Sequence, residues 1–348
     1  MTTYIIRRLL ISIPLLLAMS LITFGFIRLP RGDVLARYRN DPRFDREVLR
    51  QIEHQYRFDR SFIVQYGYWL KNLFFEWPSE QDAAKAHTFG EKLKTHFPKR
   101  FRLDLGYSFD NERPVVDVIS ERLFNTLLLS LVSLILIWAV AVPLGTYSAV
   151  HQYSMGDKVL SLIAFVGMSF PSFFLALILL YLVSLTGWLP IGGLTSSNYP
   201  QMGVAGKIVD LSKHMLVPVM VIVLGSIAGM QRLMRGNMLE VLRMQYVTTA
   251  RAKGLPESSV VYRHALRNAL NPMITIFGYM FSGLLSGAAL TEMITSYPGL
   301  GQLMLSAVMA QDIFLVMSSM MIGGVMLIAG NLVADVLLAL ADPRISYD

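Results

Sequence analysis

The stretch YVTTARAKGLPESSVVYRHALRNALNP, residues 246–272, is a short basic segment that separates two apolar runs of membrane length. The residues Met238–Lys253, which begin before this stretch and overlap its first part, mostly favour a helix. Gly254 can then adopt a left-handed conformation at the end of that helix. Pro256 suits the first turn of a second helix, where its missing N–H costs nothing. We therefore expect two helices joined by a tight turn at Gly254.

The second helix has its own start and stop signals. Glu257 favours its positive end, and the helix should end before Asn271-Pro272, because proline disfavours a helical residue ahead of it. A polar protrusion of this design fits a groove in a soluble partner, or it rests on lipid headgroups as an interfacial hairpin. Its basic residues suit an acidic groove or anionic lipid, so local physics leaves both open: Arg251, Lys253, Arg263 and Arg267.

The composition indicates a membrane protein. Of the 348 residues, 54% are hydrophobic and only 16% are charged, whereas soluble domains carry about 25% charge. The formal charge of +7 would suggest nucleic acid for a soluble protein, but basic cytoplasmic loops explain it here, and we expect no nucleic-acid partner. Cysteine is absent, which excludes disulfides and thiolate metal sites.

Six apolar runs approach the length needed to cross a hydrocarbon core about 30 Å thick. They cover residues 9–28, 124–150, 159–187, 215–231, 272–290 and 313–341. The first is too long for a signal peptide and no cleavage site follows it, so we expect an uncleaved helix. The fourth is short and should extend at one end. We therefore predict an all-α integral membrane protein with six transmembrane helices.

The charge distribution predicts which loops face the cytoplasm. The loop 232–270 contains seven arginine or lysine residues against two glutamates, whereas the loop 291–312 contains no lysine or arginine. Short loops rich in Lys and Arg stay in the cytoplasm. We therefore place both termini, 151–158 and 232–270 inside, in a cytoplasmic membrane, and 188–214 and 291–312 outside. The basic segment 29–123 is also outside, since long segments translocate largely regardless of charge.

These boundaries divide the chain into regions. We expect a first helix at 1–28, an extracytoplasmic region at 29–123, a five-helix core at 124–341 that includes the inner loop 232–271, and a cytoplasmic tail at 342–348. In the outer region, apolar spacing predicts helices at 45–56 and 61–75, the second with Ile63, Tyr66, Leu70 and Phe74 facing inward. Residues 76–102 read as a loop or insertion. The outer region is either a docking surface or a lid over the span ends.

Several kinds of chemistry are missing. The stretch Gly203–Ile208 has the wrong spacing for a phosphate-binding loop. The spans are nearly free of ionisable groups, apart from Asp335, which we expect to pair with a basic group near the inner interface. No nucleophile, acid–base pair or metal-ligand cluster indicates catalysis. We therefore expect neither an enzyme nor a metal site. A stand-alone channel or secondary carrier remains the alternative to a subunit driven by a partner.

Several segments in order resemble the permease subunits of dipeptide/oligopeptide/nickel ABC importers. The closest are RLMRGNMLEVLRMQYVTTARAKGL at 232–255 and RHALRNALNP at 263–272, and others are FPSFFLALILLYLVSLTGWLPIGG at 170–193, TEMITSYPGLGQL at 291–303 and NLVADVLLALADPRI at 331–345. The inner loop is similar to the EAA loop of that class, although Thr248-Thr249-Ala250 replaces Glu-Ala-Ala. Arg31 and the stretch around 76–103 also depart from the family pattern.

The resemblance implies a type I ABC importer permease fold and a set of partners. These are a second homologous permease subunit, two cytoplasmic ATPases that bind ATP and Mg, and an external solute-binding protein, with no cofactor on this chain. The cargo would be peptides or a similar small solute. The resemblance also implies which residues contact the ATPase: Thr249, Ala250, Arg251, Ala252, Lys253 and Gly254.

Two further groups of residues are weaker candidates. Ser169, Pro171, Gly283 and Gly287 either line or flex the translocation path, or they serve ordinary kinking and close helix packing, which we favour. The turn Tyr297-Pro298-Gly299 either touches the binding protein or plugs the path, or it is a simple reversal between helices.

Overall fold

The computed structural model describes residues 2–28, 60–76, 100–101, 103–287 and 289–341, with isolated positions at 39, 46–47, 50, 53 and 57. These residues are almost entirely helical, which confirms the all-α prediction. Short antiparallel pairs are the exception: β1 (Phe75–Glu76) with β2 (Arg100–Phe101), and β3 (Tyr107–Ser108) with β4 (Arg113–Pro114). Most of the predicted helix at 45–56, most of the 76–102 insertion and the tail 342–348 lie outside the described residues.

All six predicted apolar runs are helical. Among the described residues, four helices are long and apolar enough to cross a membrane: α1 (Thr2–Arg28), α7 (Val115–Val150), α10 (Val204–Leu242) and α17 (Ile313–Ala341). The fifth predicted run forms α14 (Asn271–Gly287) and α15 (Ala289–Ile294). With 17 residues, α14 is at the lower limit for a span. The fourth run extends at both ends, rather than at one, to give the 39 residues of α10.

The third predicted span is not one helix. It forms α8 (Met155–Ser169) and α9 (Ser172–Thr186), which are bent by 100° where they meet. Phe170 has an extended conformation, with φ −94° and ψ 130°, because the ring of the following Pro171 disfavours a helical residue before it. The apolar run hid this break, since hydropathy continues across the proline.

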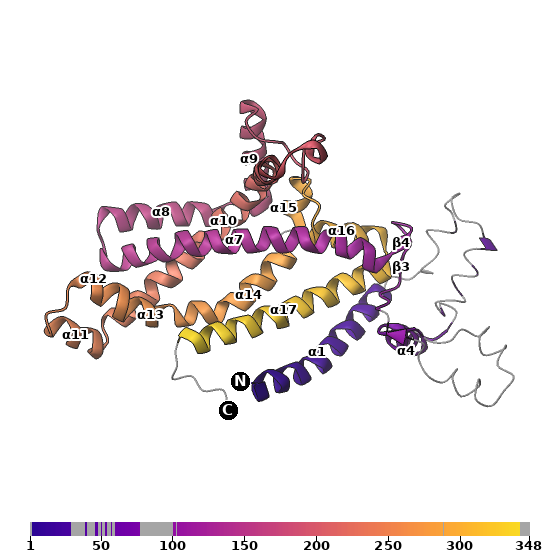
Figure 1. Ribbon diagram of the computed structural model, residues 1–348, viewed down its shortest axis with the longest axis horizontal. Coiled ribbons are helices and arrows are strands. Elements are labelled where there is room, and N and C mark those ends of the chain that lie inside the picture. Colours follow the sequence, from indigo (N-terminus) through magenta and orange to yellow (C-terminus); the bar gives the residue numbers. More distant parts are fainter. Residues whose placement is uncertain are drawn as a thin grey trace. The chain divides into compact units, whose positions relative to one another are not determined.

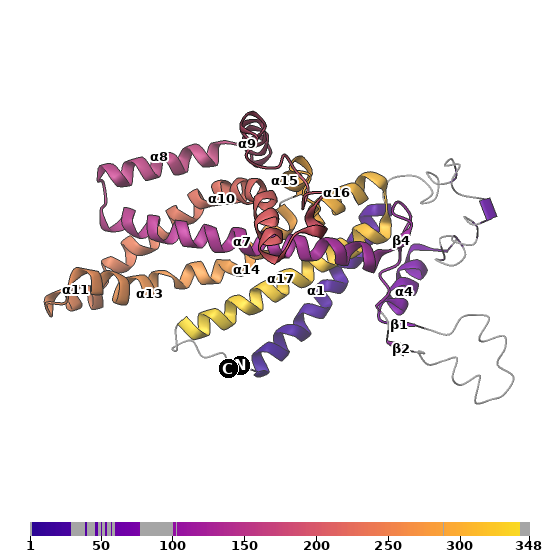
Figure 2. The same cartoon turned by 45° about the horizontal axis from the view of Figure 1, so that its top comes forward.

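The chain divides into two compact units. The first contains residues 1–12, 122–303 and 323–348, and the second contains 13–121 and 304–322. In the first unit, the start of α1, the turn between α7 and α8, and the end of α17 lie toward the same end as the helices between α10 and α14 (Figures 1 and 2). This arrangement agrees with the segments that the charge distribution assigns to one side.

An ion pair joins the two ends of the chain in the first unit. Arg8 on α1 pairs with Asp335 on α17. The expectation that Asp335 has a basic partner is therefore confirmed. A carboxylate in a span is costly without such a partner, and the pair ties the first helix to the last.

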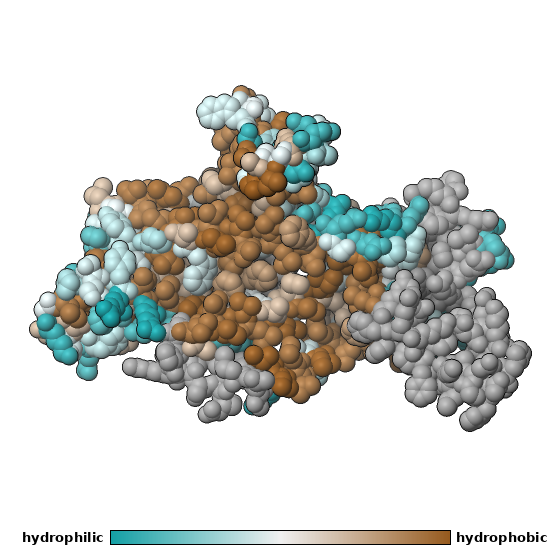
Figure 3. Space-filling view, in the orientation of Figure 1, coloured by the Kyte–Doolittle hydropathy of each residue, from teal (hydrophilic) through white to brown (hydrophobic). Residues whose placement is uncertain are grey.

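The core of the first unit is built on α10. Met230, Met234 and Met238 are almost fully buried in one cluster with Ile137 and Ala141 of α7. The two helices approach closely at Gly145, where a Cβ would stand 2.6 Å from the Cβ of Met234. The apolar lateral surface of this unit, over α7, α8 and α14, is brown in Figure 3.

The second unit includes α4 (Phe62–Asn72), which begins directly after Ser61 as predicted. Its inner face differs from the prediction. Gln65, Trp69 and Leu73 are buried, whereas Ile63 and Phe74 are exposed. The predicted stripe was partly right, because Tyr66 and Leu70 are half-buried and the ring of Tyr66 packs on Phe24 and Trp69. It missed Gln65, a polar residue that donates a hydrogen bond of 2.6 Å to the carbonyl of Arg60.

A close contact joins α14 and α17. A Cβ on Gly278 would stand 2.7 Å from Cα and 2.8 Å from N of Asn331. Because these are backbone atoms, they cannot move aside without shifting α17. A close approach therefore occurs at Gly278, whereas at Gly283, where one was predicted, a Cβ would meet nothing within 4 Å.

We expect Gly278→Ala to lower stability by about 1–3 kcal/mol, the usual cost of overpacking. Gly283→Ala, in the same helix, is the matched control and should leave the stability unchanged or slightly higher. Thermal unfolding of the detergent-solubilised protein measures both. Equal melting temperatures for the two variants would contradict the close packing of α14 on α17.

Candidate functional site in the loop between α10 and α14

The loop begins with a break that the sequence did not predict. The predicted helix over Met238–Lys253 is divided, because α10 ends at Leu242 and α11 (Gln245–Ala252) starts after an extended Met244 with φ −69° and ψ 146°. The break redirects the chain so that Val247 is fully buried, in the same core cluster as Met238. Burial of this side chain outweighs the helix propensity of the segment.

The turn at Gly254 is as predicted. Gly254 has φ +76°, and its N–H donates to the carbonyl of Arg251 at 2.9 Å. The N–H of Leu255 donates to the carbonyl of Ala250 at 3.4 Å. These two hydrogen bonds form a Schellman motif, which satisfies the last carbonyls of α11 and requires the left-handed residue.

An ion pair closes the same turn. The guanidinium of Arg251 donates to the carboxylate of Glu257, with Nη2 and Oε1 2.6 Å apart. The hydrogen bond from Arg251 lowers the pKa of Glu257 and, in return, raises the pKa of Arg251. Both side chains are exposed, so the pair stabilises the protein only modestly. Its effect is to hold the start of α12 (Glu257–Ser259) against the end of α11.

The second half of the loop is not a plain α-helix. Pro256 precedes α12 as its N-cap, one residue earlier than predicted. The π-helix η2 (Val260–Ala265) follows, then α13 (Leu266–Ala269), and α14 starts at Asn271. The segment ends at Ala269, before Asn271-Pro272 as predicted, but Asn271 is itself helical as the first residue of α14, so the proline does not account for this end. The π-helical turns were not predicted, and they bury Val260, Val261 and Ala265. Such segments frequently occur at functional sites.

The proposed contact residues divide by exposure. Thr249, Arg251, Ala252, Lys253 and Gly254 are exposed, and this end of the unit is teal in Figure 3. Ala250 is a correction, because it is only 6% exposed and belongs to the core cluster of the chain. The spacing of Val247 and Ala250 places both on the inner face of α11, and an exposed surface remains on the opposite face.

The outer turn 297–299 belongs to the interior of the chain. Tyr297 is fully buried, and its hydroxyl donates to the carbonyl of Asn125 at 3.0 Å. Gly299 is buried against the carboxylate of Glu292, and the Pro298 carbonyl accepts from the Asn125 side chain at 3.0 Å. The idea that Tyr297 touches a binding protein is therefore corrected, since its ring presents no surface. The turn is the reversal between α15 and α16 (Leu300–Ala310).

Glu292 is the residue that the sequence analysis missed. It is fully buried and accepts hydrogen bonds from the Thr126 hydroxyl at 3.2 Å and the Gln302 N–H at 2.8 Å. Burial raises the pKa of this carboxyl. Two features of the sequence hinted at it: the acid stands in a loop without lysine or arginine, and Gly299 leaves room for its side chain.

The buried carboxyl gives a pH dependence with a definite sign. The folded-state pKa of Glu292 lies above its unfolded value. The contribution of this carboxyl to the free energy of unfolding is therefore fully present below about pH 4 and is lost as the pH rises through the folded-state pKa. We expect the melting temperature of Glu292→Gln relative to the native chain to rise across that interval. Parallel curves for the two proteins between pH 4 and 8 would show that burial does not perturb this carboxyl.

The path candidates fit local roles. Ser169 and Pro171 are exposed at the break between α8 and α9, and the Ser169 hydroxyl donates to the carbonyl of Phe165 at 2.8 Å. Gly283 is exposed on α14, and Gly287 is the last residue of that helix. Among the described residues, no group of three His, Asp or Glu side chains is placed to hold a metal ion.

Comparison with known proteins identifies the family. The model for "Binding-protein-dependent transport system inner membrane component" matches residues 141–347, and the model for the N-terminal part of such membrane components matches residues 1–131. This chain belongs to the binding-protein-dependent transport permease family. The expected class of transport permease is confirmed, and a stand-alone channel or carrier is disfavoured.

Relatives and a solved structure agree with this assignment. The chain is 36% identical to the oligopeptide transport system permease protein AppB of Bacillus subtilis (strain 168), with 100% of both chains covered. It is 32% identical to the di/tripeptide transport system permease protein DppB of Pseudomonas aeruginosa (strain UCBPP-PA14), with 100% of this chain and 99% of the relative covered. An inward-facing structure of the MetNI methionine ABC transporter matches 65% of this chain and 97% of its own with a TM-score of 0.51. At 14% identity, this match supports the permease fold alone.

Proposed function

We propose that this permease carries peptides across the bacterial cytoplasmic membrane as one half of a translocation path. A second homologous permease subunit supplies the other half. Two cytoplasmic ATPases bind ATP and Mg, and a solute-binding protein delivers cargo from outside. The names of the relatives support peptides as the cargo, because both AppB and DppB are peptide permeases by name.

The exposed face of α11 carries the proposal. It is a polar surface that ends in a rigid turn and is backed by the permease core through Val247 and Ala250. We assign the ATPase contact to Thr249, Arg251, Ala252, Lys253 and Gly254, with Ala250 supporting them from inside. Closure of the ATPases on ATP would move this surface, and the core packing behind it would transmit the motion as a rigid body.

The same geometry supports an orientation. The loop lies toward the same end of its unit as the start of α1 and the end of α17 (Figure 1). If the ATPases meet the loop in the cytoplasm, both termini are cytoplasmic. The break at Pro171 then belongs to a bent segment that faces lipid or the sister subunit. We propose that Ser169 and Pro171 shape this bend, whereas Gly283 and Gly287 stay candidates for lining or flexing the translocation path.

The partner requirement is directly testable. We expect the affinity-tagged chain, purified gently from its native membrane, to bring down chains that contain a phosphate-binding loop and a second permease. The reconstituted complex should then take up labelled di- and oligopeptides only with ATP and binding protein. Uphill uptake by this chain alone in liposomes would refute the proposal, and uptake of a different solute class would refute the cargo.

Substitutions at Gly254 test whether the turn couples ATP hydrolysis to transport, separately from whether the protein folds. Gly254→Val forces a β-branched residue into φ > 0, at a cost of about 1–2 kcal/mol, so we expect roughly tenfold slower ATP-dependent uptake at normal membrane abundance. Gly254→Asn is the matched control, because asparagine tolerates this conformation, and it should retain most of the transport. Measurement of ATP hydrolysis beside uptake shows whether the valine variant is uncoupled. Full transport by that variant would contradict the role of the turn.

A further inference from the structure

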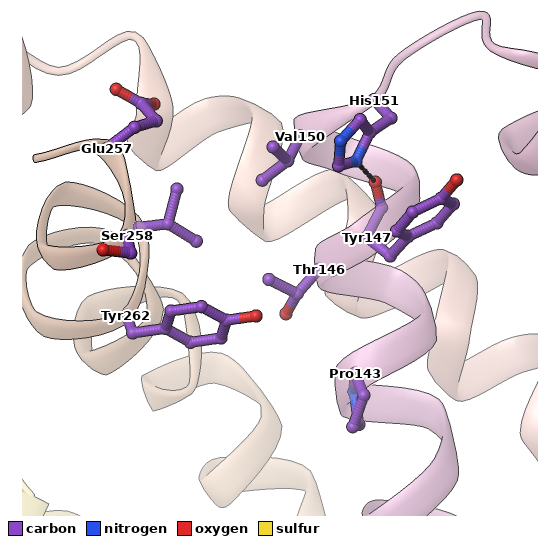
Figure 4. Close-up of a pocket in the computed structure, with 9 residues that line it drawn as sticks. Pro143, Thr146, Tyr147, Val150, His151, Glu257, Ser258 and Tyr262 are labelled. Carbon is purple, nitrogen blue, oxygen red and sulfur yellow. Dashed lines mark hydrogen bonds between the residues drawn. The ribbon is translucent and has the colours of Figure 1, made fainter.

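A cavity of about 210 Å³ lies between the inner end of α7 and the α12–η2 segment of the loop. Thr146 and Val150 line it on α7, and Val261 and Tyr262 line it on the π-helical turns. Glu257 and His151 lie at one end of the cavity and Pro143 at the other (Figure 4). The cavity therefore joins a mainly apolar interior to a polar rim.

Both walls of this cavity are fixed by contacts behind them. On the far side of α7, Gly145 packs on Met234, and the Gln231 amide donates to the Ser148 hydroxyl at 3.2 Å. On the loop side, Val261 is 5% exposed in the core cluster. The space is bounded by ordered elements that cannot collapse into it without losing these contacts.

One buried polar group in the wall has no protein partner. Thr146 is 4% exposed, and its hydroxyl makes no hydrogen bond to any described residue. Its side chain points across the cavity toward Tyr262, whose hydroxyl points back toward it (Figure 4). An unsatisfied buried hydroxyl is costly, and a hydrogen-bonding group placed in the cavity would satisfy it.

The charges around the cavity indicate what kind of ligand fits. No lysine or arginine is among its lining residues in the described part of the chain. The single carboxylate in the lining, Glu257, already accepts hydrogen bonds from Arg251. A site of this kind has no charge to offer an anion and little to offer a cation. Its apolar walls and the ring of Tyr262 favour an uncharged aromatic or aliphatic body.

We propose that this cavity is a binding site for a small uncharged amphipathic molecule, with an apolar or aromatic body and one hydroxyl or amide group bound by Thr146. Its body lies between Val150 and Tyr262, and its polar group reaches the threonine. The ligand would bridge α7 and the α12–η2 segment directly behind the turn at Gly254. Where the proposed function holds, occupancy restrains the loop and slows transport.

Binding is tested separately from transport, so that failure of one does not decide the other. Because the chain has no cysteine, Ser258→Cys at the rim can carry a single trifluoromethyl tag for ¹⁹F NMR. The probe is p-cresol, titrated into the full-length chain in its purified membrane complex. Toluene, which lacks the hydroxyl, is the matched probe. A tag at Thr248→Cys, on the exposed face of α11, reports non-specific partition into lipid or detergent.

Variants at Thr146 identify the polar contact. Thr146→Val has nearly the same shape without the hydroxyl, and Thr146→Ser keeps the hydroxyl. We expect p-cresol to shift the tag at position 258 saturably, with little change at position 248, and to bind about fivefold more tightly than toluene, as one net hydrogen bond allows. Thr146→Val should remove that preference, and Thr146→Ser should retain it.

Two results would overturn the proposal. One is the absence of saturable binding at position 258 in the intact complex, which would mean that the cavity is closed or filled by another subunit. The other is equal binding of p-cresol and toluene that Thr146→Val does not change. Unchanged toluene binding by Thr146→Val, together with the preference kept by Thr146→Ser, excludes misfolding of the valine variant as the cause of a lost preference.

Discussion

The hydrocarbon core of a bilayer offers no water to backbone N–H and C=O groups, and the rest of this structure follows from that constraint. Each segment that crosses must satisfy its own backbone, so the long apolar runs are helices. Turns and breaks then need special provision. In the inner loop, outside the hydrocarbon core, the left-handed Gly254 serves the same end by returning the last carbonyls of α11 to hydrogen bonds. At the α8–α9 break, the Pro171 carbonyl accepts from the N–H groups of Phe174 and Leu175. Pro143 and Pro218 lie inside unbroken helices, which neighbouring helices make tolerable.

The inner loop is rigid because different contacts hold its buried face and its exposed face. Its buried face belongs to the same core as α10 and α7, through Val247, Ala250 and Val261. Its exposed face is closed by the Schellman hydrogen bonds and by the ion pair of Arg251 with Glu257. A surface attached in this way moves with the core instead of folding aside. This is the property that a coupling element needs, since force on a flexible loop would be lost as local motion.

Buried carboxylates organise turns in each unit. Glu292 holds the α15–α16 turn in the first unit by accepting from backbone N–H and the Thr126 hydroxyl. In the second unit, Asp312 accepts from the Ser108 hydroxyl at 2.7 Å and from the N–H of Leu315 at 3.2 Å. Both carboxyls are fully buried, and burial raises the pKa of each. These acids replace the water that would otherwise satisfy the backbone groups of the turns.

The sequence by itself determined the class of fold, the helical runs, the turn at Gly254 and the family, because hydropathy, helix-ending residues and ordered motifs are local signals. It also anticipated a basic partner for Asp335, since an unpaired charge in a span is expensive. Only the tertiary structure decided that Ala250 faces the core, that Tyr297 is buried, that Glu292 holds the outer turn and that Gly278 is a point of close helix packing. Each of these depends on which residue from a distant part of the chain lies opposite, such as Asn331 opposite Gly278. A pattern read along one segment contains no information about that neighbour.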